Sequence, residues 1–141
     1  MKYLIIGAGG TGGVVGFHMA QAGKDVTLIA RDAHLERIQQ KGLTLQTMWD
    51  ENTKAIPVKA SDMQHYKDRP DVILVCVKGY SLDGIYEFIR RIAKPQTIVI
   101  PIFNIYGTGA KMQEKLPVML VTDGCIYVSA NIKEPGVILQ H

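Results

Sequence analysis

A glycine-rich turn near the N-terminus constrains the fold of this chain more than any other feature. Residues 7–12 read GAGGTG, follow the apolar run Lys2–Ile6 and open a helical segment, Gly10–Ala22. In the pattern G-x-G-x-x-G, the first glycine allows a tight turn and the second lets a pyrophosphate approach the backbone. The third lets the helix lie close to the strand. The turn therefore predicts a strand–turn–helix unit that binds a dinucleotide.

Beyond this turn, short β-branched runs alternate with amphipathic segments, as in a parallel sheet covered by helices. The expected strands are Lys2–Ile6, Asp25–Ala30, Leu43–Met48, Lys54–Lys59, Asp71–Val77, Thr97–Phe103, Val118–Thr122, Cys125–Ala130 and Val137–Gln140. The expected helices are Gly10–Ala22, Asp32–Lys41, Ser81–Lys94 and Gly107–Leu116. We therefore expect one α/β domain over residues 1–141, Rossmann-type and doubly wound, with a mostly parallel sheet and helices on both faces.

Two local features refine this expectation. Gly12, Gly16 and Ala20 recur every four residues, so one face of the first helix is nearly bare and should lie close against the sheet. The runs Leu43–Met48 and Lys54–Lys59 flank a polar turn, and we expect them to be antiparallel additions.

The end of the second strand indicates which nucleotide binds. Sites for NAD usually place Asp or Glu there to hold the ribose hydroxyls, whereas this sequence has Ala30 followed by Arg31. A small residue leaves room for a 2′-phosphate, and a guanidinium can bind it with paired charged hydrogen bonds. These two residues favour NADP, although Asp32 keeps NAD open.

Two further candidates follow later strands. Lys78 leaves the Asp71–Val77 strand at its carboxyl end, where ligands bind in open α/β sheets, and with Tyr80 it is placed to cover the adenosine half. A loop lysine is an equally good interpretation on position alone. Asn104 follows Thr97–Phe103 at the same edge, where its position alone favours a turn residue over a ligand.

Composition excludes several other classes of protein. The net charge is only +3, and the basic residues are scattered, which argues against a nucleic-acid partner. Cys76 and Cys125 lie far apart in apolar runs, so we expect two reduced core thiols. The dispersed histidines and cysteines predict no metal site. No run is long enough for a membrane span or signal peptide, and we expect a cytoplasmic protein.

Taken together, these motifs resemble the ketopantoate reductases. The matching order is the glycine-rich turn, Arg31, Lys78 with Tyr80, and Pro101 with Asn104. The stretches 124–130 and 134–138 are similar to the end of that family's N-terminal domain, so the similarity runs the length of the chain. One departure is Ile105, where the family usually has glycine after the asparagine. A Cβ there changes the backbone angles open to the loop.

The resemblance implies NADPH-dependent reduction of a 2-keto acid, in that family ketopantoate to pantoate on the route to coenzyme A. It implies cofactor binding by Gly7, Ala8, Gly9, Gly10, Thr11, Gly12, Arg31, Lys78 and Asn104. Arg31 then meets the 2′-phosphate, and Asn104 lies at the nicotinamide end. The family's catalytic lysine and acidic partner belong to a helical second domain, so we expect no catalytic residue in this chain. Its abrupt end after a strand suggests a piece of a two-domain reductase that is inactive alone.

Three other functions stay open. A non-catalytic NAD(P)-sensing domain also begins with such a glycine turn, but it tends to keep an acid where this chain has Ala30 and Arg31. A methyltransferase would want an acid there too. A paralogous reductase of another keto acid has the same fold and is not distinguished by it. The oligomeric state is equally open, with a homodimer among the alternatives.

Overall fold

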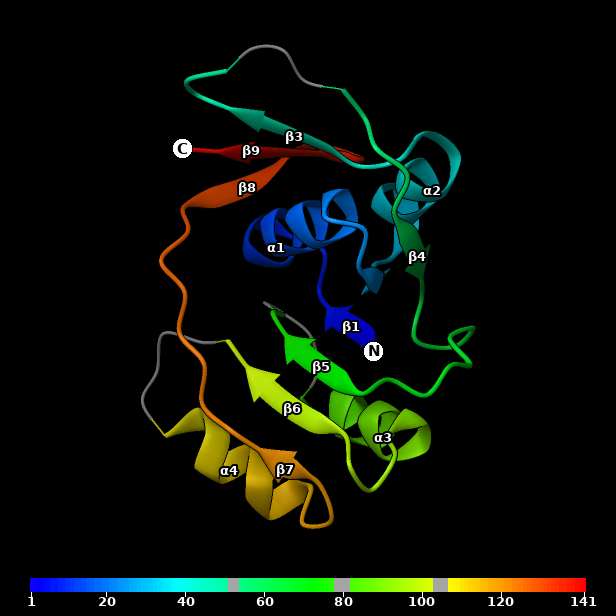
Figure 1. The fold of residues 1–141 in the computed structure, drawn as a ribbon, viewed down its shortest axis with the longest axis vertical. Helices are drawn as coiled ribbons and strands as arrows, with labels where there is room; N and C mark the ends of the chain where they lie inside the picture. Colours follow the sequence, from blue (N-terminus) through cyan, green and yellow to red (C-terminus); the bar gives the residue numbers. More distant parts are fainter. Residues whose placement is uncertain (51–53, 78–81, 103–106) are drawn as a thin grey trace.

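Two β-sheets organise the chain, and the larger one has the expected parallel arrangement (Figure 1). The computed structural model describes residues 1–50, 54–77, 82–102 and 107–141. The large sheet has six strands in the order β4-β2-β1-β5-β6-β7, and every pairing within it is parallel. Its strands are β1 (Lys2–Ile6), β2 (Asp25–Ile29), β4 (Lys59–Ser61), β5 (Val72–Val75), β6 (Ile98–Pro101) and β7 (Leu120–Val121).

Helices cover both faces of this sheet, which confirms the doubly wound Rossmann-type fold. Side chains of α1 (Gly10–Gln21) and α2 (Asp32–Lys41) share one buried cluster with Ile5 and Leu28. Those of α3 (Leu82–Ile92) and α4 (Thr108–Lys115) share the other with Leu4 and Ile6. Successive residues of a strand face opposite sides, so the two clusters are the two faces of the sheet. The strand order reverses between β1 and β5, the point where open α/β sheets bind ligands.

A second sheet, of three strands, lies over α1 on the side away from the large sheet (Figure 1). Its strands are β3 (Thr44–Thr47), β9 (Val137–Gln140) and β8 (Ala130–Glu134), in the order β3-β9-β8. Helix α1 is therefore held between two sheets, and glycines permit the close approach on each side. A Cβ on Gly16 would lie 2.5 Å from Leu28 of the large sheet, and one on Gly13 would lie 2.6 Å from Ile138 of β9. The expected bare face toward the large sheet is present, and the opposite side has a second close contact at Gly13.

The expected antiparallel additions after the second helix are wrong. Strand β3 pairs in parallel with β9, and β4 joins β2 in parallel within the large sheet. In place of a second strand at Lys54–Lys59, the described residues there form an isolated antiparallel bridge between Leu43 and Ile56. An apolar alternation shows that a run is extended, but it does not identify the partner strand. Here that partner lies at the far end of the chain.

The expected strand Cys125–Ala130 is also misplaced, because β8 starts only at Ala130. The chain here crosses from β7 in the large sheet to the second sheet (Figure 1), and among the described residues, those at 125–129 are part of no strand. Tyr127 is accordingly 97% exposed. Cys125 is also exposed rather than a core thiol, whereas Cys76 is half-buried. The segment is a connection between sheets.

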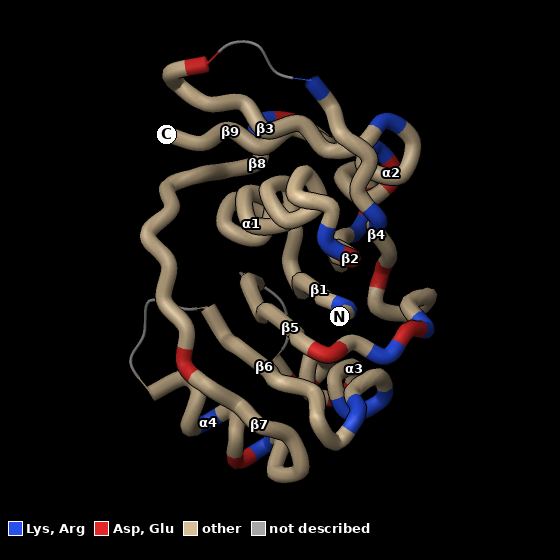
Figure 2. The backbone as a smooth tube through the Cα atoms, in the orientation of Figure 1, with Lys and Arg blue, Asp and Glu red and all other residues tan. Residues whose placement is uncertain are grey.

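Charged residues lie mainly at the periphery. Figure 2 shows them along α2, α3, α4 and the connections, whereas α1, β5 and β6 are free of them. None of the described helices is long and apolar enough to cross a membrane. The described residues also contain no group of three or more His, Cys, Asp or Glu side chains that could hold a metal ion.

Candidate functional site

A cavity of about 460 Å³ opens where β1, β2 and β5 end. Ile6, the last residue of β1, is in register with Ile29 of β2 and with Val75 of β5, so the three strands end at one level. The volume lies in the range of small-molecule sites. Lining residues come from the glycine-rich turn, the start of α2, the end of β5 and β8. They are Gly7, Ala8, Gly9, Gly10, Thr11, Ala30, Arg31, Asp32, Ala33, His34, Cys76, Val77, Ala130 and Ile132.

The glycine-rich turn forms the floor of this cavity, and its glycines differ in function. Gly7 has φ +104°, a left-handed conformation that favours glycine. A Cβ on Gly9 would meet nothing within 4 Å, so its backbone faces open space. A Cβ on Gly12 would lie 1.8 Å from the carbonyl oxygen of Gly7. Gly12 therefore does not line the cavity but brings helix and turn together.

The N-terminus of α1 points its positive end toward the cavity. Its N-cap is Gly9, no acidic residue occupies its first turn, and no side chain caps it. The free N–H groups and the helix dipole favour an anion at this position. A phosphate group therefore fits between the turn and the helix.

Ala30 and Arg31 form the adjoining wall of the cavity. Ala30 is buried, and its N–H donates to the carbonyl of Ser61 at 3.0 Å, which fixes the end of β2 against β4. Arg31 is exposed and is the N-cap of α2. Asp32 also lines the cavity and has φ +57°, a left-handed conformation that Asp tolerates better than most residues. A cationic side chain thus follows a small residue at the position that discriminates between the nucleotides.

Six lining residues have no role in the site that the sequence predicts: Ala33, His34, Cys76, Val77, Ala130 and Ile132. His34 and Ile132 belong to no motif, and the contact of His34 with Gly136 joins distant parts of the chain. Cys76 lies on the β5 side, and burial raises the pKa of its thiol to about 12, so this thiol is uncharged at neutral pH. Burial lowers the pKa of His34, because it disfavours the charged imidazolium, and the hydrogen bond to Ala8 acts to raise it.

Lys78, Tyr80, Asn104 and Ile105 lie outside the described residues. The residue before Lys78, Val77, is buried and lines the cavity. The cofactor role of Lys78 and Asn104 therefore stays a prediction.

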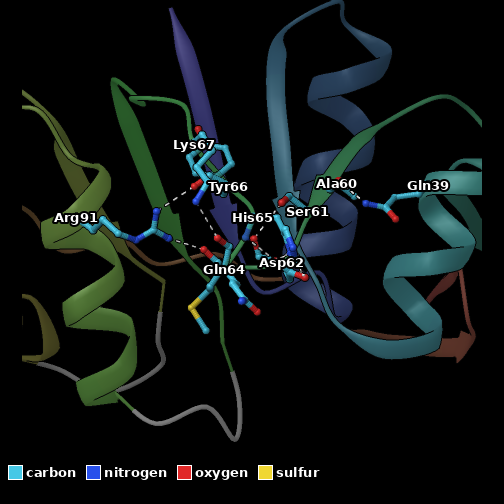
Figure 3. Close-up of polar contacts among 10 residues, drawn as sticks. Gln39, Ala60, Ser61, Asp62, Gln64, His65, Tyr66, Lys67 and Arg91 are labelled. Carbon is cyan, nitrogen blue, oxygen red and sulfur yellow. Dashed lines mark hydrogen bonds and ion pairs between the residues drawn. The ribbon is translucent and has the colours of Figure 1, made fainter.

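A second polar cluster lies in the connection between β4 and β5 (Figure 3). The Asp62 carboxylate accepts hydrogen bonds from the backbone and ring of His65, which lowers the pKa of Asp62. From α3, Arg91 donates to the carbonyls of Tyr66 and Met63 (Figure 3). These groups satisfy one another within the connection, so the cluster fixes the chain and offers no reactive group.

The sequence and fold match known reductases along almost the whole chain. A family model described as "Ketopantoate reductase PanE/ApbA" matches residues 3–141. A 2-dehydropantoate 2-reductase from Pyrococcus horikoshii is 34% identical over 98% of this chain and 44% of its own length. The crystal structure of 2-dehydropantoate 2-reductase from Porphyromonas gingivalis has a TM-score of 0.85 and 30% identity, covering 100% of this chain and 51% of that one.

A further solved structure shares the fold at lower identity. A D-mandelate dehydrogenase with NADH and anilino(oxo)acetate has a TM-score of 0.86 and 23% identity, covering 100% of this chain and 45% of that one. This chain therefore spans about half the length of the proteins that it resembles.

Proposed function

The chain belongs to the ketopantoate reductase family, and we propose that it is the NADP-binding domain of an NADPH-dependent 2-keto acid reductase. The proposed reaction of the whole reductase is the reduction of ketopantoate to pantoate. The family is one of oxidoreductases, and the curated relatives are about twice as long as this chain. Residues 1–141 then hold the nucleotide and do not supply the reacting groups.

One observation carries the choice of NADP: Ala30 and Arg31 line the same cavity as the glycine-rich turn. A dinucleotide whose pyrophosphate lies on the turn extends its adenosine ribose toward the end of β2. Arg31 is then the cation next to a 2′-phosphate, and Ala30 carries no carboxylate that would repel it. The open space at Gly9 supports this fit, because a side chain there would occupy the path of the pyrophosphate.

In this function the bound NADPH supplies the hydride for carbonyl reduction. The residues of the chain bind and orient the cofactor. The turn and the N-terminus of α1 hold the pyrophosphate, and Arg31 holds the 2′-phosphate. We assign Lys78 to the cofactor side of the cleft and Asn104 to the nicotinamide end. We assign the proton donor and the group that binds the substrate carboxylate to the part of the relatives that this chain does not span.

Calorimetric titration with NADPH and NADH tests the assignment. The unmodified chain should bind NADPH more tightly, and Arg31→Ala should remove most of that preference. Loss of a charged hydrogen-bonded pair costs about 1.5–3 kcal/mol, or roughly ten- to a hundredfold in affinity. Lys41→Ala, at the far end of the same helix, removes the same charge and should leave the preference intact. Equal affinities of the unmodified chain for the two nucleotides would refute NADP.

A further inference from the structure

His34 joins three segments that are distant in the sequence. It lies in the first turn of α2 and is half-buried. Its Nε2 is 2.7 Å from the carbonyl oxygen of Ala8 in the glycine-rich turn. Its Nδ1 is 2.9 Å from the backbone nitrogen of Gly136, which lies in the turn between β8 and β9. One imidazole ring thus connects the floor of the cavity to the second sheet.

The partners of this ring determine its protonation. A peptide N–H can only donate, so Nδ1 of His34 accepts from Gly136 and carries no proton. A carbonyl can only accept, so Nε2 carries the proton and donates it to Ala8. The ring is therefore neutral, with its proton on Nε2. The burial that lowers the pKa of His34 acts in the same direction.

The glycine-rich turn has few side chains that could fix its backbone, so a contact from another segment is needed to hold it. Of its side chains only Thr11 carries a polar group, and the glycines that admit a pyrophosphate also leave the backbone conformationally free. A second contact lies one residue beyond the open space, where a Cβ on Gly10 would be 2.0 Å from the carbonyl oxygen of Ala130. The second sheet therefore presses on the turn at Gly10 and is tied to it through His34.

We propose that His34 is a positioning residue for the cofactor's pyrophosphate: as a neutral Nε2–H imidazole it fixes the Ala8 carbonyl, and with it the backbone of the glycine-rich turn, to the β8–β9 turn. His34 acts through Ala8 and Gly9 and need not touch the cofactor. The inference rests on the proposed function for its ligand, whereas the hydrogen-bonded tie can be tested without any ligand.

Three substitutions separate the two hydrogen bonds. His34→Ala removes both. In His34→Gln the side-chain nitrogen stands near the place of Nε2 and can still donate to Ala8, and in His34→Asn the side-chain oxygen stands near Nδ1 and can still accept from Gly136. The matched control is His65→Ala, a histidine with a 74% exposed side chain that pairs with Asp62 away from the cavity.

The ligands are NADPH, which carries the pyrophosphate, and 2′-AMP, which carries only the phosphate that we assign to Arg31. His34→Ala should weaken NADPH binding roughly tenfold and change 2′-AMP binding less than about twofold, because the two neutral hydrogen bonds that it removes, to Ala8 and Gly136, fix the turn proposed to hold the pyrophosphate. His34→Gln should recover most of the NADPH affinity and His34→Asn should recover little. His65→Ala should match the unmodified chain. Equal losses for both ligands, or full recovery with Asn, would overturn the proposal.

Two ligand-free measurements keep this test separate from the proposed function. Nitrogen NMR of the histidine rings should show His34 neutral with its proton on Nε2. Amide hydrogen exchange of residues 8–10 should be faster in His34→Ala than in the unmodified chain, without general unfolding. If the unmodified chain binds neither nucleotide, the proposed function fails. The two ligand-free measurements still show whether His34 links Ala8 to Gly136 by hydrogen bonds. A charged ring, or unchanged exchange at residues 8–10, would overturn the inference itself.

Discussion

The two faces of the large sheet bury their helices in different ways. On one face, α3 packs a single side, with Ile85, Ile89 and Ile92 buried against the sheet and its arginines outside. On the other, α1 is enclosed between the large sheet and the second sheet, and it contains no Asp, Glu, Lys or Arg. The cavity lies at the enclosed helix, and none of its lining residues belongs to α3 or α4. The candidate site therefore lies at the helix whose terminus is held from two sides.

The largest expected effect comes from truncating one buried isoleucine on each face of the large sheet. Ile89 of α3 and Ile138 of β9 are both fully buried, and replacing either with alanine should lower the free energy of unfolding by about 2–5 kcal/mol. Only Ile138→Ala should also weaken NADPH binding by the folded molecules, because Ile138 packs against Gly13 in the first turn of α1. Urea unfolding and nucleotide titration of both variants give the comparison. A similar loss of affinity in the two would mean that the faces do not differ in this way.

A smaller effect, of opposite sign on the two helices, comes from adding one methyl group. Gly13→Ala places a Cβ against Ile138 and should cost about 1–3 kcal/mol. Gly84→Ala, at an exposed position inside α3, should instead stabilise by about 0.5–1 kcal/mol, the helix preference for alanine. In an Ile138→Ala background the cost of Gly13→Ala should largely disappear, because the two sites share one contact. Thermal melts of the single and double variants measure this. An unchanged cost in the double variant would place the strain elsewhere.

The smallest effect is a difference in pH response. Burial raises the pKa of Tyr66, on the α3 face, from 10.0 to about 12, so the folded chain keeps this proton longer than the unfolded chain. The contribution of Tyr66 to the free energy of unfolding should be complete below pH 10 and be lost as the pH rises toward 12. Burial lowers the pKa of His34 below 6.5. The contribution of His34 to the free energy of unfolding should therefore be complete above that pH and be lost as the pH falls.

Urea unfolding across pH checks both directions, with Tyr66→Phe and His34→Gln as the respective controls. Tyr66→Phe should flatten the alkaline limb and leave the acid limb unchanged, and His34→Gln should do the reverse. A variant that altered both limbs would show that the two faces do not respond separately.

The same contrast explains what the sequence could predict. Helix α3 could be predicted from local periodicity, because one side of it is exposed to solvent and the other is buried. The glycine-rich turn and Arg31 also follow from local sequence, since their spacing and order are enough to indicate a nucleotide. The second sheet could not be predicted, because β3 pairs with β9, whose residues lie at the other end of the chain. The role of His34 could not be predicted for the same reason, because its hydrogen-bond partner Gly136 lies 102 residues away in the sequence.

The pairing of β3 with β9 also sets an order of events during synthesis. The turn and the first strands leave the ribosome early, but the sheet that presses on α1 is incomplete until Val137–Gln140 has emerged. Contacts of such long sequence separation are slow to form. A nascent chain that does not yet include β9 therefore carries the whole glycine-rich turn without the complete second sheet that packs on α1.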